Sequence, residues 1–96
     1  MSFYFHPDAE AELQDAINYY EDIRGSLGHD FAVEVYSAIQ RAVSMPESWT
    51  LIDAGIRRSL VSRFPYGILY SEVNNKIYIL AVMNLHRKPD YWKDRC

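Results

Sequence analysis

Residues 66–86 of this 96-residue chain read YGILYSEVNNKIYILAVMNLH, and this stretch decides the fold. Two runs rich in Ile, Val, Leu and Tyr, Tyr66–Val73 and Lys76–His86, flank the pair Asn74-Asn75. β-Branched and aromatic side chains favour strands, and Asn tolerates the positive φ angles that a two-residue type I′ turn requires. The stretch therefore predicts a β-hairpin.

The two-residue turn also fixes the register that we expect for the hairpin. Tyr70 then faces Ile79, and Ile68 faces Ala81. Both faces of the hairpin are apolar over much of their length. We therefore expect it at the centre of a sheet, with one face against helices and the other partly open or covered by a partner.

A third strand is expected before the hairpin, over Ile56–Phe64, after a connection at residues 46–55. Strand alternation places Arg57 and Arg63 on one face, at most about 20 Å apart, and Arg58 on the other. By this parity Arg57 and Arg63 can act together. Arg58 is expected to form a structural ion pair with an acidic residue of a helix.

Two amphipathic helices are expected further upstream, after a short strand over Ser2–His6. Pro7 suits the first turn of a helix, Gly25 suits its end, and Pro46 stops the second helix. The apolar stripes consist of Ala9, Leu13, Ala16, Ile17, Tyr20 and Ile23, then Phe31, Val35, Ala38, Ile39, Ala42 and Val43. The sequence thus predicts one α+β domain over residues 1–96. Its α-helical hairpin packs on a mainly antiparallel sheet with a short N-terminal strand and a C-terminal three-strand meander.

The two halves of the chain carry opposite charge. Residues 1–48 contain nine Asp/Glu against two Arg, about −7, and residues 49–96 contain eight Lys/Arg against four Asp/Glu, about +4. A cationic half within a chain of formal net charge −3 points to an anionic partner. The alternatives are a solvated sheet face with a basic tail, or a surface that binds phosphate or carboxylate groups.

Composition disfavours several classes of protein. The one cysteine, Cys96, allows no intrachain disulfide, which fits a reducing cytoplasm. We expect no signal peptide or membrane span, because the sequence has no basic leader region and no long apolar run. His6, His29 and His86 lack the spacing of metal ligands, and there is no glycine-rich phosphate loop. We therefore expect neither a metal nor a cofactor.

The C-terminal segment carries the remaining candidates. Tyr91 and Trp92, beside Arg87, are suited to stack on nucleic-acid bases, or else they pack the tail onto the sheet. His86 is suited to general acid–base chemistry near neutral pH, although a single His at a strand end is more commonly a surface residue.

The order of elements, together with a series of motifs, resembles the RelE/ParE superfamily of toxins from type II toxin–antitoxin modules. The most specific part is Phe-Pro-Tyr at 64–66 followed by the ending His86-Arg87…Pro89…Tyr91-Trp92. The resemblance spans essentially the whole chain. The other residues that support the resemblance are Phe5–Leu13, Tyr19-Tyr20-Glu21, Phe31, Val35, Pro46, Trp49, Gly55–Arg58, Arg63, Tyr70 and Ile79–Val82.

The resemblance implies a growth-arresting toxin that a cognate antitoxin neutralises. RelE-like members cut mRNA in the ribosomal A site, whereas ParE-like members poison DNA gyrase and are not nucleases. A nuclease would use Arg57, Arg63, His86, Arg87 and Tyr91 in catalysis. Target binding would involve Arg87, Lys88, Tyr91, Trp92, Lys93 and Arg95. The isoelectric point of about 5.5 departs from the strongly basic nucleases, and so does the lack of lysine before Lys76. These departures favour the ParE-like or plasmid-stabilisation branch.

The resemblance further implies a flexible antitoxin segment that covers exposed apolar surface, and no membrane partner. The expected contacts are Phe31, Val35, Ile39, Tyr66 and Tyr70, on the helical hairpin and the Tyr-rich sheet. A third alternative is a degenerate toxin that acts only as a co-repressor with the antitoxin. Growth arrest on expression without the neighbouring gene distinguishes a toxin from such a protein.

Overall fold

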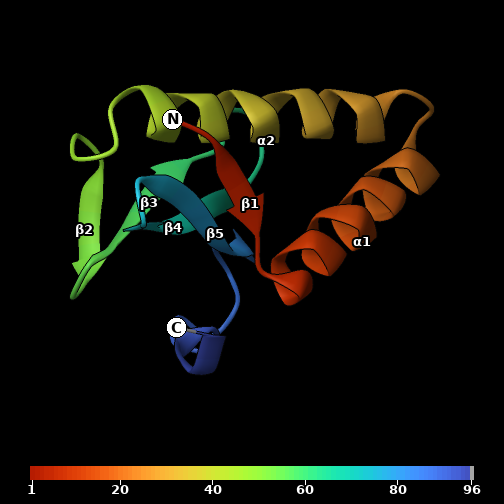
Figure 1. Ribbon diagram of the computed structural model, residues 1–96. Helices are drawn as coiled ribbons and strands as arrows, with labels where there is room; N and C mark the ends of the chain where they lie inside the picture. Colours follow the sequence, from red (N-terminus) through yellow and green to blue (C-terminus); the bar gives the residue numbers. More distant parts are fainter. Residues whose placement is uncertain (96) are drawn as a thin grey trace.

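The computed structural model describes residues 1–95, and Figure 1 shows its helices on one side of the sheet and the C-terminal turn on the other. The sheet has the strand order β1-β5-β4-β3-β2, in which β1 runs parallel to β5 and all other pairs are antiparallel. The elements are β1 (Phe3–Phe5), α1 (Pro7–Ile23), α2 (Leu27–Ser44), β2 (Thr50–Asp53), β3 (Ile56–Leu60), β4 (Tyr66–Val73), β5 (Lys76–Asn84) and the 3₁₀ helix η1 (Lys93–Arg95). The expected α+β fold is confirmed.

The helical hairpin begins at a capped proline and turns around one carboxylate. Pro7 occupies the first position of α1, and the ring nitrogen Nδ1 of His6 accepts a hydrogen bond from the Asp8 amide at 3.0 Å. Between the helices, Glu21 accepts hydrogen bonds from the amides of Ser26 and Gly28, both at 2.9 Å. These bonds satisfy amide groups at the start of α2 that have no partner within the helix.

Gly28 lies inside the first turn of α2. A Cβ at this position would lie 2.5 Å from the carbonyl oxygen of Ile17. Glycine is therefore needed where α2 crosses α1, because only a residue without a side chain lets the two backbones approach so closely.

The central hairpin forms as expected at its turn but differs in register beyond Tyr70. Asn74 and Asn75 have φ angles of 50° and 64°, and Tyr70 pairs with Ile79. Ile68 pairs with Val82, not with Ala81, because a bulge shifts the register between Leu69 and Tyr70. As a result Leu80 and Ala81 of β5 both contribute to the cluster on the face opposite the helices.

The sheet separates two apolar clusters. The larger lies between the sheet and both helices and includes Phe31, Ile39 and Tyr70, each at most 1% exposed. The smaller lies on the opposite face, where the tail residue Trp92 is 2% exposed. It consists of Ile56, Leu69, Leu80, Ala81, Met83 and Trp92. The tail therefore covers part of the face that the helices leave open, and we call this side the open face.

One strand was not expected from the sequence. Strand β2 lies within the 46–55 connection and pairs only with β3, at one edge of the sheet. All four of its residues are exposed. An edge strand that buries neither face needs no apolar alternation, so the sequence carries no strand signal there.

Candidate functional site

The C-terminal tail is anchored to α1 by a buried ion pair. Arg95 donates from Nη1 to Glu12 Oε1 at 2.9 Å and from Nη2 to Oε2 at 3.1 Å. Glu12 also accepts a hydrogen bond from the Val82 amide, and Arg95 donates to the Leu80 carbonyl oxygen. The side chains of Arg95 and Glu12 are only 11% and 14% exposed, and Glu12 raises the pKa of Arg95. The guanidinium thus ties the tail to both α1 and β5.

Tyr91 lies in the same cluster, between two guanidinium groups. The central carbon of the Arg87 guanidinium lies 3.8 Å from the centre of the Tyr91 ring, and that of Arg95 lies 5.0 Å away. The Tyr91 hydroxyl is buried without a hydrogen-bond partner within residues 1–95. Burial, followed by the neighbouring Glu12, raises the pKa of Tyr91, so the phenol stays protonated at neutral pH. The phenolate that a general base would require is therefore disfavoured.

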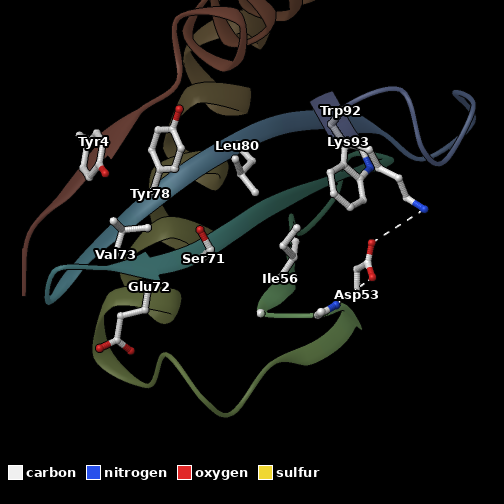
Figure 2. Close-up of a pocket in the computed structure, with 12 residues that line it drawn as sticks. Tyr4, Asp53, Ile56, Ser71, Glu72, Val73, Tyr78, Leu80, Trp92 and Lys93 are labelled. Atoms are coloured by element: carbon white, nitrogen blue, oxygen red, sulfur yellow. Dashed lines mark hydrogen bonds and ion pairs between the residues drawn. The ribbon is translucent and has the colours of Figure 1, made fainter. Parts of the chain in front are cut away.

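A groove of about 650 Å³ lies on the open face beside the tail (Figure 2). Tyr4 and Tyr78 stack at one end, with ring centres 4.7 Å apart, and Trp92 stands at the other. Lys93 Nζ lies 3.8 Å from Asp53 and connects the tail to β2. The lining residues are Tyr4, Asp53, Ala54, Gly55, Ile56, Ser71, Glu72, Val73, Tyr78, Leu80, Trp92 and Lys93. The groove is mainly apolar and suits an apolar side chain better than a charged ligand.

A second hollow of about 540 Å³ shares Asp53, Trp92 and Lys93 with this groove. Its other lining residues are Ile52, Arg58, Met83, Lys88, Pro89 and Asp90. The expectation that Arg58 pairs with a helix acid is wrong, because within residues 1–95 Arg58 forms no ion pair and lines this hollow on the open face. The helix acids pair instead with arginines of the loops and tail, such as Arg63 with Asp30.

The structure does not gather the residues predicted for a nuclease. Arg57 donates to the Trp49 carbonyl oxygen at 2.8 Å. Arg63 lies beyond the end of β3 with a φ of 72° and pairs with Asp30 of α2 at 3.6 Å, so it does not share a strand face with Arg57. His86 is exposed. Of the five residues predicted to be catalytic, Arg87 and Tyr91 are the pair for which the structure gives a direct contact within residues 1–95.

The residues predicted to bind a target divide into two groups. Trp92 is buried and Arg95 is largely buried, and both hold the tail in place. The other group, Lys88, Lys93 and Arg87, is exposed at the surface of the tail. Tyr91 is half-buried under Arg87. Only part of the predicted cationic surface is therefore available to a ligand.

The residues predicted to contact an antitoxin lie largely in the core. Phe31, Val35 and Ile39 are 0% exposed and Tyr70 is 1% exposed, so their side chains present no surface to a partner. Tyr66 is half-buried and packs on Phe31, with ring centres 4.8 Å apart. The groove was not predicted from the sequence, although the apolar side chains on both faces of β5 indicated apolar surface on the face opposite the helices.

Within residues 1–95 no group of three or more His, Cys, Asp or Glu side chains is placed to hold a metal ion. Neither helix of this region has the length and apolar character required to cross a membrane.

No protein-family model matches the sequence, and no curated protein matches it. The fold, in contrast, is similar to that of a chain in a solved structure of the chromosomal ParDE TA system from P. aeruginosa. The match has a TM-score of 0.77 and 16% sequence identity, and it covers 88% of this chain and 96% of that chain. The expected α+β fold is thereby shown to be shared with a chain of that ParDE TA system.

Proposed function

We propose that this chain is the toxin of a type II toxin–antitoxin pair and is neutralised in the cytoplasm by a cognate antitoxin. The observation that carries the proposal is the fold shared with a chain of the ParDE TA system over most of both chains. The motifs from Phe64-Pro65-Tyr66 to Tyr91-Trp92 support it independently, since they resemble the RelE/ParE toxins at the level of sequence.

The proposed target is DNA gyrase. Three features disfavour a nuclease and so favour a gyrase poison. Within residues 1–95, Arg57, Arg63 and Arg87 hold different partners and form no common cation cluster that would stabilise a phosphorane. The raised pKa of Tyr91 disfavours the phenolate that would accept the proton of a ribose 2′-hydroxyl. The net charge of −3 also weakens long-range attraction to ribosomal RNA.

Expression from a tightly repressed promoter in a host without the antitoxin tests this proposal. We expect growth arrest on induction, with mRNA ends at A-site codons unchanged by primer extension. Arg87→Ala should leave arrest largely intact, because Arg87 acts here through Tyr91 and Glu12 and not on RNA. Codon-specific cleavage that Arg87→Ala abolishes would instead indicate the RelE-like activity. Normal growth of cells that contain soluble, folded chain would indicate a degenerate toxin.

A further inference from the structure

Arg58 is the one arginine that the described fold leaves without a partner. Its half-buried guanidinium makes no ion pair or hydrogen bond within residues 1–95, and its Nε is buried. The other six arginines each have one: Arg24, Arg41, Arg57, Arg63, Arg87 and Arg95. The guanidinium of Arg58 therefore has donors that the described chain does not use, and these suit an acceptor that comes from outside the chain.

The neighbouring strand holds the aliphatic part of Arg58 in place. A Cβ at Gly67 of β4 would lie 3.1 Å from Cγ and 3.2 Å from Cδ of Arg58. The side chain therefore rests against backbone that only glycine leaves open. A guanidinium that is already positioned loses less conformational freedom when it binds a ligand.

The charges around Arg58 suit a single carboxylate and not a polyanion. The hollow is lined by Arg58, Lys88 and Lys93 and by two acids, Asp53 and Asp90. Lys93 is paired with Asp53, which leaves two cations against one acid. A nucleic-acid backbone carries one charge per phosphate and would meet both acids, whereas one carboxylate needs only Arg58 and Lys88.

The hollow continues into the apolar groove on the other side of Trp92. The two share Asp53, Trp92 and Lys93, and the groove offers Ile56 and Leu80 as apolar surface (Figure 2). A ligand that spans both must therefore combine an apolar group with an acid. Peptide segments provide this combination, because neighbouring side chains can differ in character.

We propose that the open face binds a peptide segment of a partner protein that places an apolar side chain in the groove and an Asp or Glu carboxylate on Arg58. The proposal rests on the proposed function in that it gives the chemistry by which an antitoxin would be recognised. The chain can bind such a peptide without being toxic, however, so the peptide-binding proposal and the proposed function can fail independently.

Selection of random 12-residue peptides displayed on phage, with the full chain as bait, tests the proposal. Wild type and Arg58→Gln are compared with Lys76→Gln, which removes an exposed cation at the far end of β5. We expect wild type and Lys76→Gln to select an acid at a constant spacing from an apolar residue. Arg58→Gln should retain the apolar preference and lose the acidic one.

A synthetic consensus peptide then gives the magnitude by fluorescence anisotropy. Replacing its acid by the amide should weaken binding to wild type by about tenfold or more, and binding to Arg58→Gln by less than about twofold. If Arg58→Gln does not fold, binding of the acid and amide peptides to wild type still tests the contact of the carboxylate. Binding to Ser71→Trp, whose larger side chain fills the groove, then tests the apolar contact. Failure to select any peptide would overturn the proposal. So would a consensus without an acid, or self-association of the chain through this face. Displacement of the peptide by a 12-nucleotide RNA whose own binding requires Arg58 would likewise overturn it.

Discussion

Replacing Glu12 by Gln is expected to loosen the C-terminal tail from the rest of the fold. The carboxylate accepts two hydrogen bonds from Arg95 and one from the Val82 amide, and it lies 3.7 Å from Arg87. Gln retains an oxygen for the Val82 amide but carries no charge. The guanidinium of Arg95, only 11% exposed, then loses this partner and keeps the largely exposed Asp8 carboxylate, whose Oδ2 lies 3.8 Å from its Nε.

The size of the effect follows from the burial of this pair. Removing one partner of a buried ion pair costs about 3–5 kcal/mol, and the residual exposure of both side chains places Glu12→Gln near 3 kcal/mol. Arg95→Gln should cost a similar amount, because it leaves the Glu12 charge buried. The double variant leaves no buried charge, so it should cost about 2 kcal/mol less than the sum of the single variants.

Urea unfolding followed by tryptophan fluorescence and by circular dichroism measures these free energies. Trp92 is 2% exposed and neighbours the anchor in sequence, so its emission reports release of the tail. Lys93→Gln is the control, since its pair with Asp53 is exposed and should contribute at most about 0.5 kcal/mol. The predicted coupling would be contradicted if the losses in unfolding free energy of Glu12→Gln and Arg95→Gln added up to that of the double variant. It would also be contradicted if each single variant stayed within about 0.5 kcal/mol of wild type.

Three further predictions concern the helical hairpin. Gly28→Ala should destabilise the chain by about 1–3 kcal/mol in thermal unfolding, because its Cβ would lie 2.5 Å from a backbone oxygen of α1. Gly25→Ala, with nothing within 4 Å, should stay within about 0.5 kcal/mol of wild type. Hydrogen bonds from the amides of Ser26 and Gly28 lower the pKa of Glu21. The contribution of Glu21 to stability is therefore present above its unfolded pKa near 4.5 and is lost as pH falls through its folded pKa. If the free energy of unfolding of a Glu21→Gln variant fell with decreasing pH as steeply as that of wild type, this prediction would be contradicted. Phe31→Asp buries an unpaired charge in the core and should unfold the chain at a cost above about 4 kcal/mol, so that a folded, soluble variant would argue against the packing described.

The sequence predicted those parts of the fold that depend on local signals. Asn74-Asn75 identified the turn because the positive φ angles there are a property of the residues themselves. The bulge between Leu69 and Tyr70 left no such signal. Leu80 and Ala81 are both apolar, so the sequence alone does not reveal that the two neighbours lie on the same face.

The errors at the candidate site arose from extending strand parity beyond the strand. Strand β3 ends at Leu60, so alternation says nothing about Arg63, which turns toward α2 and pairs with Asp30. Parity did place Arg58 on the face opposite Arg57. Whether an acid stands on that face depends on where the helices pack, and this is a tertiary contact that no short pattern records.

The direct test of the central claim is a supercoiling assay with purified gyrase, relaxed plasmid and the purified chain. We expect supercoiling to be lost as the chain is titrated in, and we expect Phe31→Asp to be inactive because it does not fold. Full supercoiling at every concentration of a preparation that still arrests growth when expressed would contradict it, and would assign the arrest to a target other than gyrase.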